Sequence, residues 1–269
     1  MYSVLVSVLL GLAVGLGLGL TGVSGYGWST FFGVLTFVAG QVVIGMRLRK
    51  RVTAVTQDVQ NILAAGQKQM QAKVARWQMR PPGSIQEAQA ELAKERRVFV
   101  KDALDRSEAL HAFERWIPML GRQIATIQIQ LHWLIPDFKK VDALMPKALF
   151  IDPTMAAMKI ARMYMRDESS EAIAKVYEKA VRRLRYNQNA LLAATYSWIL
   201  VQRKDVDGAF KALVRALEKS DNPVLKANRD TLANNRVAHF TNSGLGDPWY
   251  ALQLEEPRMH HPRQRMQWR

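Results

Sequence analysis

The chain has 269 residues, with 38 Lys or Arg against 23 Asp or Glu and a formal net charge of +15. Its length permits one or two domains, and the lack of cysteine excludes disulfides, thiolate catalysis and Cys-based metal sites. The charge is uneven, because residues 1–46 contain no Asp, Glu, Lys or Arg and hold ten of the 16 glycines. The remainder is rich in Ala, Leu, Gln, Lys, Arg and Met, which favours helix. We therefore predict an all-α protein with an apolar head and a charged body.

The apolar head contains two runs of membrane-spanning length. Residues 4–23 and 28–46 can each cross about 30 Å of hydrocarbon at about 1.5 Å per residue. Four basic residues follow the second run directly: Arg47, Arg49, Lys50 and Arg51. The positive-inside rule then places the body in the cytoplasm. A cleaved signal sequence is the alternative, but it needs a basic n-region and a shorter apolar run, so we expect an integral protein of a bacterial inner membrane or its equivalent, anchored by a two-span hairpin.

Glycines in the head fit two different patterns. Residues 17–22 match G-x-G-x-x-G, but a dinucleotide site needs an acid about 20 residues further on, and the first acid of the chain is Asp58. The preferred interpretation is a small-residue face that lets membrane helices approach closely. The candidate glycines are Gly11, Gly15 and Gly19 on the first span and Gly33 and Gly40 on the second. The sequence leaves open whether this face packs within the hairpin, joins two copies of the chain, or reflects general glycine enrichment.

Residues 47–80 have the apolar spacing of an amphipathic helix that continues the second span as a stalk. Pro81 and Pro82 predict its end. The segment holds eight Lys or Arg against one acid, and each such charge near anionic lipid gains about 1 kcal/mol. Nucleic-acid binding and a purely topological role are the alternatives, although no nucleic-acid recognition motif accompanies the charge.

Residues 81–153 are predicted to form a helical linker domain. Ser84 and Glu87 have the spacing of a capping box, which predicts a helix over 84–116. A second helix is predicted over 119–135 because prolines bracket it.

Residues 154–236 are predicted to form paired helices. The expected helices cover 154–166, 171–185, 188–202 and 208–219. Similar residues recur in successive pairs, since Tyr164 is followed by Trp198 and Ala180 by Ala216 at corresponding places. The interval between them has the size of the period in stacked helix–turn–helix repeats.

Several of these residues resemble a tetratricopeptide repeat. They are Ala193, Tyr196, Ser197, Ala209, Leu213, Ala216 and Leu217, with Pro223 as a late stop, and the run Ala148–Pro153 is similar to a repeat end. The chain departs from the family pattern because the Trp-x-x-Leu-Gly opening is absent and Pro146 would break the helix before Ala148. Generic antiparallel helical hairpins are the alternative.

The resemblance implies a concave surface that binds a partner's peptide or helix. The candidate groove residues are Arg162, Arg166, Asn187, Asn189 and Gln202. Residues 154–222 hold 13 basic against 8 acidic residues, which favours a partner with an acidic segment. The tail, 237–269, carries Trp249 and Tyr250, which are costly to expose and are expected to dock on the body or on a partner.

No catalytic, cofactor or metal motif is complete in the sequence. The run Asp205-Val206-Asp207-Gly208 resembles a calcium loop, but Arg203 would occupy its first ligand position. An Asp cap at an inter-helix turn explains it better. We therefore expect a non-enzymatic interaction or assembly platform without cofactor or small-molecule substrate. The alternative is a structural subunit of an oligomeric membrane complex, and lipid or nucleic-acid binding by the basic region is a weaker third.

Overall fold

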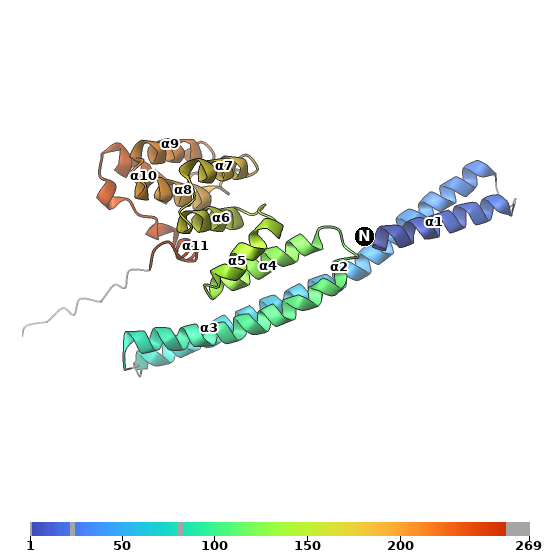
Figure 1. The fold of residues 1–269 in the computed structure, drawn as a ribbon, viewed down its shortest axis with the longest axis horizontal. Coiled ribbons are helices and arrows are strands. Elements are labelled where there is room, and N and C mark those ends of the chain that lie inside the picture. Colours follow the sequence, from blue (N-terminus) through green and yellow to red (C-terminus); the bar gives the residue numbers. More distant parts are fainter. Residues whose placement is uncertain (1, 22–24, 80–82, 257–269) are drawn as a thin grey trace, which may run out of the picture. The chain divides into compact units, whose positions relative to one another are not determined.

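The computed structural model describes residues 2–21, 25–79 and 83–256. All regular secondary structure in these ranges is helical, which confirms the all-α prediction. The predicted helix stop at Pro81 and Pro82, the end of the first predicted span (22–23) and the end of the tail (257–269) lie outside the described residues. The chain divides into two compact units, Met1–Leu149 and Phe150–Arg269, here called the N-terminal and the C-terminal unit (Figure 1).

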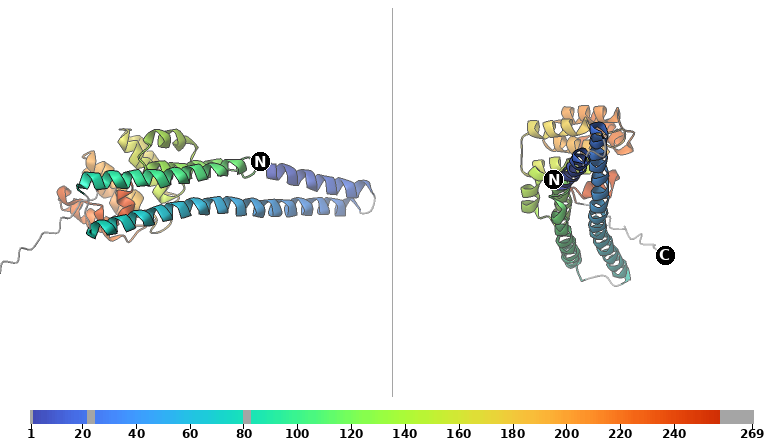
Figure 2. Two further views of the ribbon diagram at one scale, coloured as in Figure 1. Left: turned by 90° about the horizontal axis from the view of Figure 1, so that it is seen from below. Right: turned by 90° about the vertical axis from the view of Figure 1, so that its right-hand side faces the viewer.

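The N-terminal unit is organised along one long helix. Its described helices are α1 (Tyr2–Leu20), α2 (Tyr26–Met79), α3 (Ile85–Glu108), the 3-10 helix η1 (Ala109–Phe113), α4 (Leu120–Leu134), α5 (Phe138–Leu144) and the 3-10 helix η2 (Met145–Lys147). Helix α2 has 54 residues and carries both the second apolar run and the basic amphipathic segment. Helix α1 packs along its first part and α3 along its second (Figure 1; Figure 2, left-hand view).

The two parts of α2 have different packing. In the second part, Val55 and Val59 are buried against side chains of α3, η1 and α4. Gly66 lies so close to α3 that an added Cβ would clash with the ring of Phe99. Ion pairs join the surfaces of the two helices, with Lys73 contacting both Glu91 and Glu95. These two carboxylates raise the pKa of Lys73.

The ends of α3 follow from local chemistry. The Ser84 hydroxyl accepts a hydrogen bond from the Glu87 amide at 3.1 Å, as the capping-box spacing predicts. The predicted helix to residue 116 is too long, because α3 ends at Glu108 and the chain tightens into η1. Pro118 cannot donate a backbone hydrogen bond, and Met119 has a left-handed φ of 63° before α4 begins.

The C-terminal unit consists of short helices joined by tight turns. Its described helices are α6 (Pro153–Met165), α7 (Ser170–Val181), α8 (Ala190–Gln202), α9 (Val206–Leu217), α10 (Pro223–Ala233), the 3-10 helices η3 (Val237–His239) and η4 (Ser243–Leu245), and α11 (Asp247–Tyr250). Helices α6 and α7 form one hairpin and α8 and α9 the next, and α8 packs against both α6 and α10. Helices α6, α8 and α10 are called the first helices below.

The first helices begin and end in similar ways. They begin at Pro153, Ala190 and Pro223, at nearly equal intervals along the chain. Asp152 and Asn222 cap α6 and α10 in the same way, with the side-chain oxygen accepting from the second and third amides of the helix. All three helices close with a residue in the left-handed region: Asp167, Lys204 and Asn235.

Each of these closing turns also has the same pair of hydrogen bonds. The left-handed residue donates to the carbonyl three residues back, and the next residue donates to the carbonyl five residues back. This is the Schellman arrangement, which satisfies the last carbonyls of a helix. The prediction that Pro223 is a late stop is wrong, because Pro223 opens α10 as its first residue. Helix α10 therefore matches the first helix of a third hairpin.

Candidate functional site: a basic groove beside the apolar hairpin

The candidate packing glycines bring the backbones of α1 and α2 together. A Cβ on Gly11 would lie 2.7 Å from the Gly33 carbonyl oxygen, and a Cβ on Gly33 would lie 2.9 Å from the Gly11 carbonyl oxygen. Gly15 faces Gly33 and Ser29 at 3.4–3.5 Å, and Gly40 faces Ser7 at 3.3 Å. Gly19 is looser, 3.9 Å from Ser29. Within this chain the glycine face packs inside the hairpin.

The start of α1 is tied to the turn between η1 and α4. The Tyr2 amide donates to the Arg115 carbonyl at 2.9 Å, and the Ser3 hydroxyl donates to the Trp116 carbonyl at 2.7 Å. The rings of Tyr2 and Trp116 meet edge to face with centroids 5.6 Å apart. Helices α1 and α3 therefore lie end to end along α2. The start of α1 is held at this junction by two hydrogen bonds and one aromatic pair.

A groove of about 700 Å³ opens at this junction. Its lining comes from α2 and from the 109–118 turn: Ile44, Arg47, Leu48, Lys50, Arg51, Ala112, Phe113 and Trp116. The three basic side chains are exposed, whereas Phe113 and Trp116 are half-buried. The fourth residue of the predicted basic cluster, Arg49, is exposed but does not line the groove. The groove, called the basic groove below, thus combines cations with an aromatic wall.

The aromatic wall of the basic groove is absent from the sequence-based prediction. The sequence spacing places Phe113 and Trp116 with Val98, Leu104 and Leu110 on one partly buried face of the helix predicted over 84–116. The sequence signal that could have identified this wall is the preference of Trp and Tyr for membrane–water interfaces. That preference alone does not select Trp116, and only its pairing with Tyr2 in the structure does so.

In the C-terminal unit, residues 237–256 lie across α8 and α10. Asn242 is fully buried and donates to the Ala194 carbonyl of α8 at 3.0 Å. Asn228 of α10 donates to Asn242 at 2.8 Å and accepts from the Thr241 amide at 3.1 Å. These contacts fix the path of the segment across two of the first helices.

Trp249 is the main anchor of this segment. Its side chain is 0% exposed, and its ring lies 5.9 Å from that of Trp198 on α8. Both indole N–H groups donate to the Glu255 carboxylate, Trp198 at 2.5 Å and Trp249 at 2.9 Å. Tyr250 is only half-buried. Trp249 therefore docks on its own unit, and the polar ends of both indoles are satisfied there.

Two of the five candidate groove residues have structural roles, which corrects the sequence-based choice. Asn189 is 2% exposed and donates to the Ala216 carbonyl at the end of α9. Asn187 adopts a left-handed φ of 60° and bonds to Lys219 and Asp221 in the loop before α10. The sequence around each asparagine gave no sign of this, because the partners lie at and just after the end of α9, far along the chain.

The other candidates lie near the ends of α6 and α8. Arg166 is exposed and forms an ion pair of 3.7 Å with Glu168, Gln202 is exposed, and Arg162 is half-buried. These three residues are accessible, whereas parts of α8 and α10 are covered by residues 237–256.

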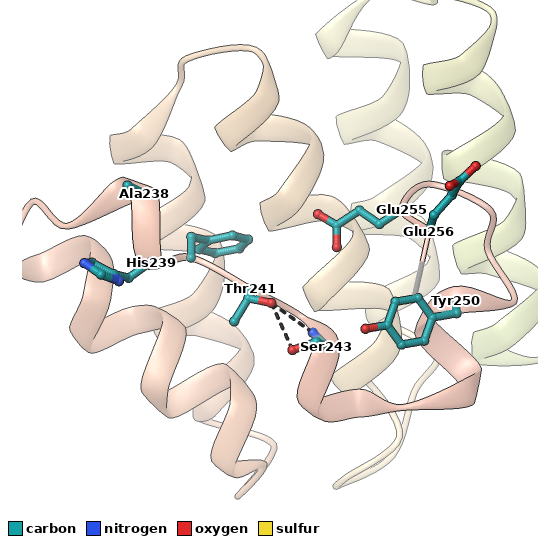
Figure 3. A pocket seen from close by; sticks show the side chains of 8 residues that line it. Ala238, His239, Thr241, Ser243, Tyr250, Glu255 and Glu256 are labelled. Atoms are coloured by element: carbon teal, nitrogen blue, oxygen red, sulfur yellow. Dashed lines mark hydrogen bonds between the residues drawn. The ribbon is translucent and has the colours of Figure 1, made fainter. Parts of the chain in front are cut away.

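A second hollow of about 680 Å³ lies beside that covering segment (Figure 3). Its polar lining includes His239, Ser243, Tyr250 and Glu255. The Ser243 hydroxyl is hydrogen-bonded to Thr241, and the His239 ring points away from Ser243. The Glu255 carboxylate accepts hydrogen bonds from the two indoles. The described residues hold no group of three or more His, Asp or Glu side chains arranged to bind a metal ion.

Comparison with protein-family models, with curated proteins and with solved structures finds no match to this chain.

Replacing Gly11 by Ala should destabilise the hairpin by roughly 1–3 kcal/mol, because the new methyl group would meet backbone atoms that cannot move aside independently. Gly17→Ala is the matched control, since a Cβ there meets nothing within 4 Å and Ala is the better helix former. Unfolding of the purified chain in mixed micelles, followed by circular dichroism, measures both. Equal stability of the two variants would contradict the close packing.

Replacing Trp249 by Ala should lower the free energy of unfolding by about 3–5 kcal/mol, as for other buried aromatic residues. Trp249→Phe keeps most of the ring but loses the N–H donor to Glu255, so its effect should be smaller, about 1–3 kcal/mol. Tyr186→Ala, at a 64% exposed side chain of the same unit, is the control and should change little. Thermal unfolding measures all three, and a mild effect of Trp249→Ala would show that the segment is loosely held.

Proposed function

We propose that this protein is a non-enzymatic interaction platform anchored in a membrane by α1 and the first part of α2. One observation carries the anchoring: the residues that α1 buries are Ser3, Ser7 and Gly11, whereas most of its Leu and Val side chains face outward. Leu9 and Leu16, for example, are 58% and 62% exposed. A water-soluble helix buries its apolar face instead, while lipid accepts outward apolar side chains and small residues mediate packing.

Length and composition support the same proposal. Among the described residues, two helices are long and apolar enough to cross a membrane, α1 and the first part of α2. The basic residues 47–51 follow on the same continuous helix, without a break at which direction could change. The positive-inside rule then favours a cytoplasmic position for the end of α2 and for the rest of the chain after it.

The C-terminal unit supports the interaction role. Its three first helices share closing turns and start at nearly equal intervals, and two of them share a cap, which is the organisation of stacked helical repeats. We interpret it as a tetratricopeptide-like array of two hairpins and a further first helix. Such arrays bind peptides or helices of other proteins, and the basic excess favours an acidic partner segment. Arg162, Arg166 and Gln202 are the accessible candidates for this contact.

Membrane topology can be tested with single cysteines, because the natural chain has none. Gly25→Cys lies between the two apolar runs and Gln202→Cys lies on the C-terminal unit; both positions are exposed. In intact spheroplasts a membrane-impermeant maleimide should label the first variant and not the second until the membrane is permeabilised. Labelling of both in intact cells, or release of the protein by alkaline carbonate, would refute the anchored topology.

Partner binding can be tested by placing a photo-crosslinking amino acid at Gln202 in native membranes. The expected product is a crosslink to a distinct protein, and Arg166→Glu should reduce its yield about fivefold or more by opposing an acidic partner. Lys211→Glu is the matched control, because Lys211 is an exposed base on α9, away from the ends of α6 and α8.

The same crosslinking distinguishes the alternative function, a structural subunit of an oligomeric membrane complex. One observation favours it: the hairpin retains an open apolar groove of about 570 Å³ lined in part by Gly11, Gly15 and Gly33. Crosslinks only between copies of the chain, together with a large native mass in detergent, would support the structural subunit and contradict the platform.

A further inference from the structure

We propose that the basic groove binds the headgroup phosphate of an anionic phospholipid. The inference rests on the proposed membrane anchoring and adds a specific lipid site to it. Three basic side chains, Arg47, Lys50 and Arg51, line the groove opposite Phe113 and Trp116. Lipid phosphate carries the negative charge that this lining lacks, and an aromatic wall suits the glycerol and upper acyl region.

The helical geometry explains why these three cations act together. Residues three and four positions apart share one face of a helix, so Arg47 directs its side chain with Lys50 and Arg51. Arg49 lies about 200° around the helix from Arg47 at about 100° per residue, which agrees with its absence from the lining. A uniform attraction between a basic helix and a charged membrane would use all four residues alike, whereas the groove uses three.

The cations of the groove are available for a ligand. None of the three forms an ion pair with any residue in the part of the chain that the structure describes, in contrast to Lys73 and Arg106 further along the same helix pair. Three neighbouring positive charges without a counterion repel one another, and a phosphate with several acceptor oxygens relieves that repulsion.

The position of the groove agrees with a lipid as the source of the phosphate. Ile44 and Leu48 line the groove on α2, and Ile44 belongs to the apolar run that ends before Arg47. The Tyr2–Trp116 pair lies at the start of α1, next to the same groove. Aromatic side chains of this kind prefer the headgroup level, so the groove is expected to lie where lipid phosphates are, with its apolar end toward the acyl chains.

The test uses the full-length chain in detergent micelles, titrated with phosphatidylglycerol or with phosphatidylcholine and read by native mass spectrometry. We expect one phosphatidylglycerol to bind at low lipid concentration and phosphatidylcholine to bind at least tenfold more weakly. Arg47→Gln and Arg51→Gln should each weaken phosphatidylglycerol binding about fivefold, the effect of one basic residue at a lipid surface. Arg49→Gln is the matched control and should leave the affinity unchanged.

Each other outcome would overturn the inference. Equal losses in Arg47→Gln and Arg49→Gln would show diffuse attraction, and equal binding of both lipids would remove the charge argument. Displacement of the lipid by millimolar inorganic phosphate would show a free-phosphate site instead. Trp116→Phe keeps an aromatic wall and should retain the selectivity for phosphatidylglycerol, so loss of that selectivity in Trp116→Phe would also contradict the inference. Carbonate extraction of the same variants reports anchoring separately, so loss of lipid selectivity in a firmly anchored protein refutes only the lipid site.

Discussion

The N-terminal unit depends on the unbroken course of α2. No proline interrupts residues 26–79, so one helix carries an apolar part, a basic cluster and a polar amphipathic part in that order. Helices α1 and α3 pack along successive parts of it and meet end to end near the basic cluster. The change from apolar to charged surface on α2 therefore coincides with the junction of two other elements, and the basic groove is a consequence of that coincidence.

Different interactions hold α1 against α2 along the helix and at its first residues. Along its length, the missing side chains of Gly11 and Gly33 allow backbone contact that a single methyl group would prevent, and dispersion is the main attraction available between such helices in lipid. At its start, hydrogen bonds from Tyr2 and Ser3 supply the partners that the first amides of a helix and a buried hydroxyl otherwise lack. Together they fix the level of the Tyr2–Trp116 pair relative to α2, and with it the depth of the proposed lipid site.

The C-terminal unit closes its own inner surface. Residues 237–256 cross α10 and α8 through Asn242 and Trp249. In the repeat array proposed for this unit, this surface would hold the binding groove. The Glu255 carboxylate satisfies two buried indole donors at once, so removing the segment would leave the Trp198 donor unpaired. The partner proposed for this unit would therefore either use the exposed ends of α6 and α8 or replace contacts that the chain already makes with itself.

The sequence alone determined the helical class, the apolar run before Arg47, the Ser84 cap and most helices within a few residues, because these depend on hydrophobic period and on contacts within one turn. It misplaced the end of α3, the role of Pro223 and the roles of Asn187 and Asn189. The end of α3 and the role of Pro223 depend on a local turn and a local cap, whereas the tertiary structure decided the roles of the two asparagines, since their partners lie far along the chain. The direction of the glycine face and the placement of Arg47 and the distant Trp116 around one groove were likewise set by packing. A periodic pattern specifies which face of a helix is apolar or small but not which element covers it.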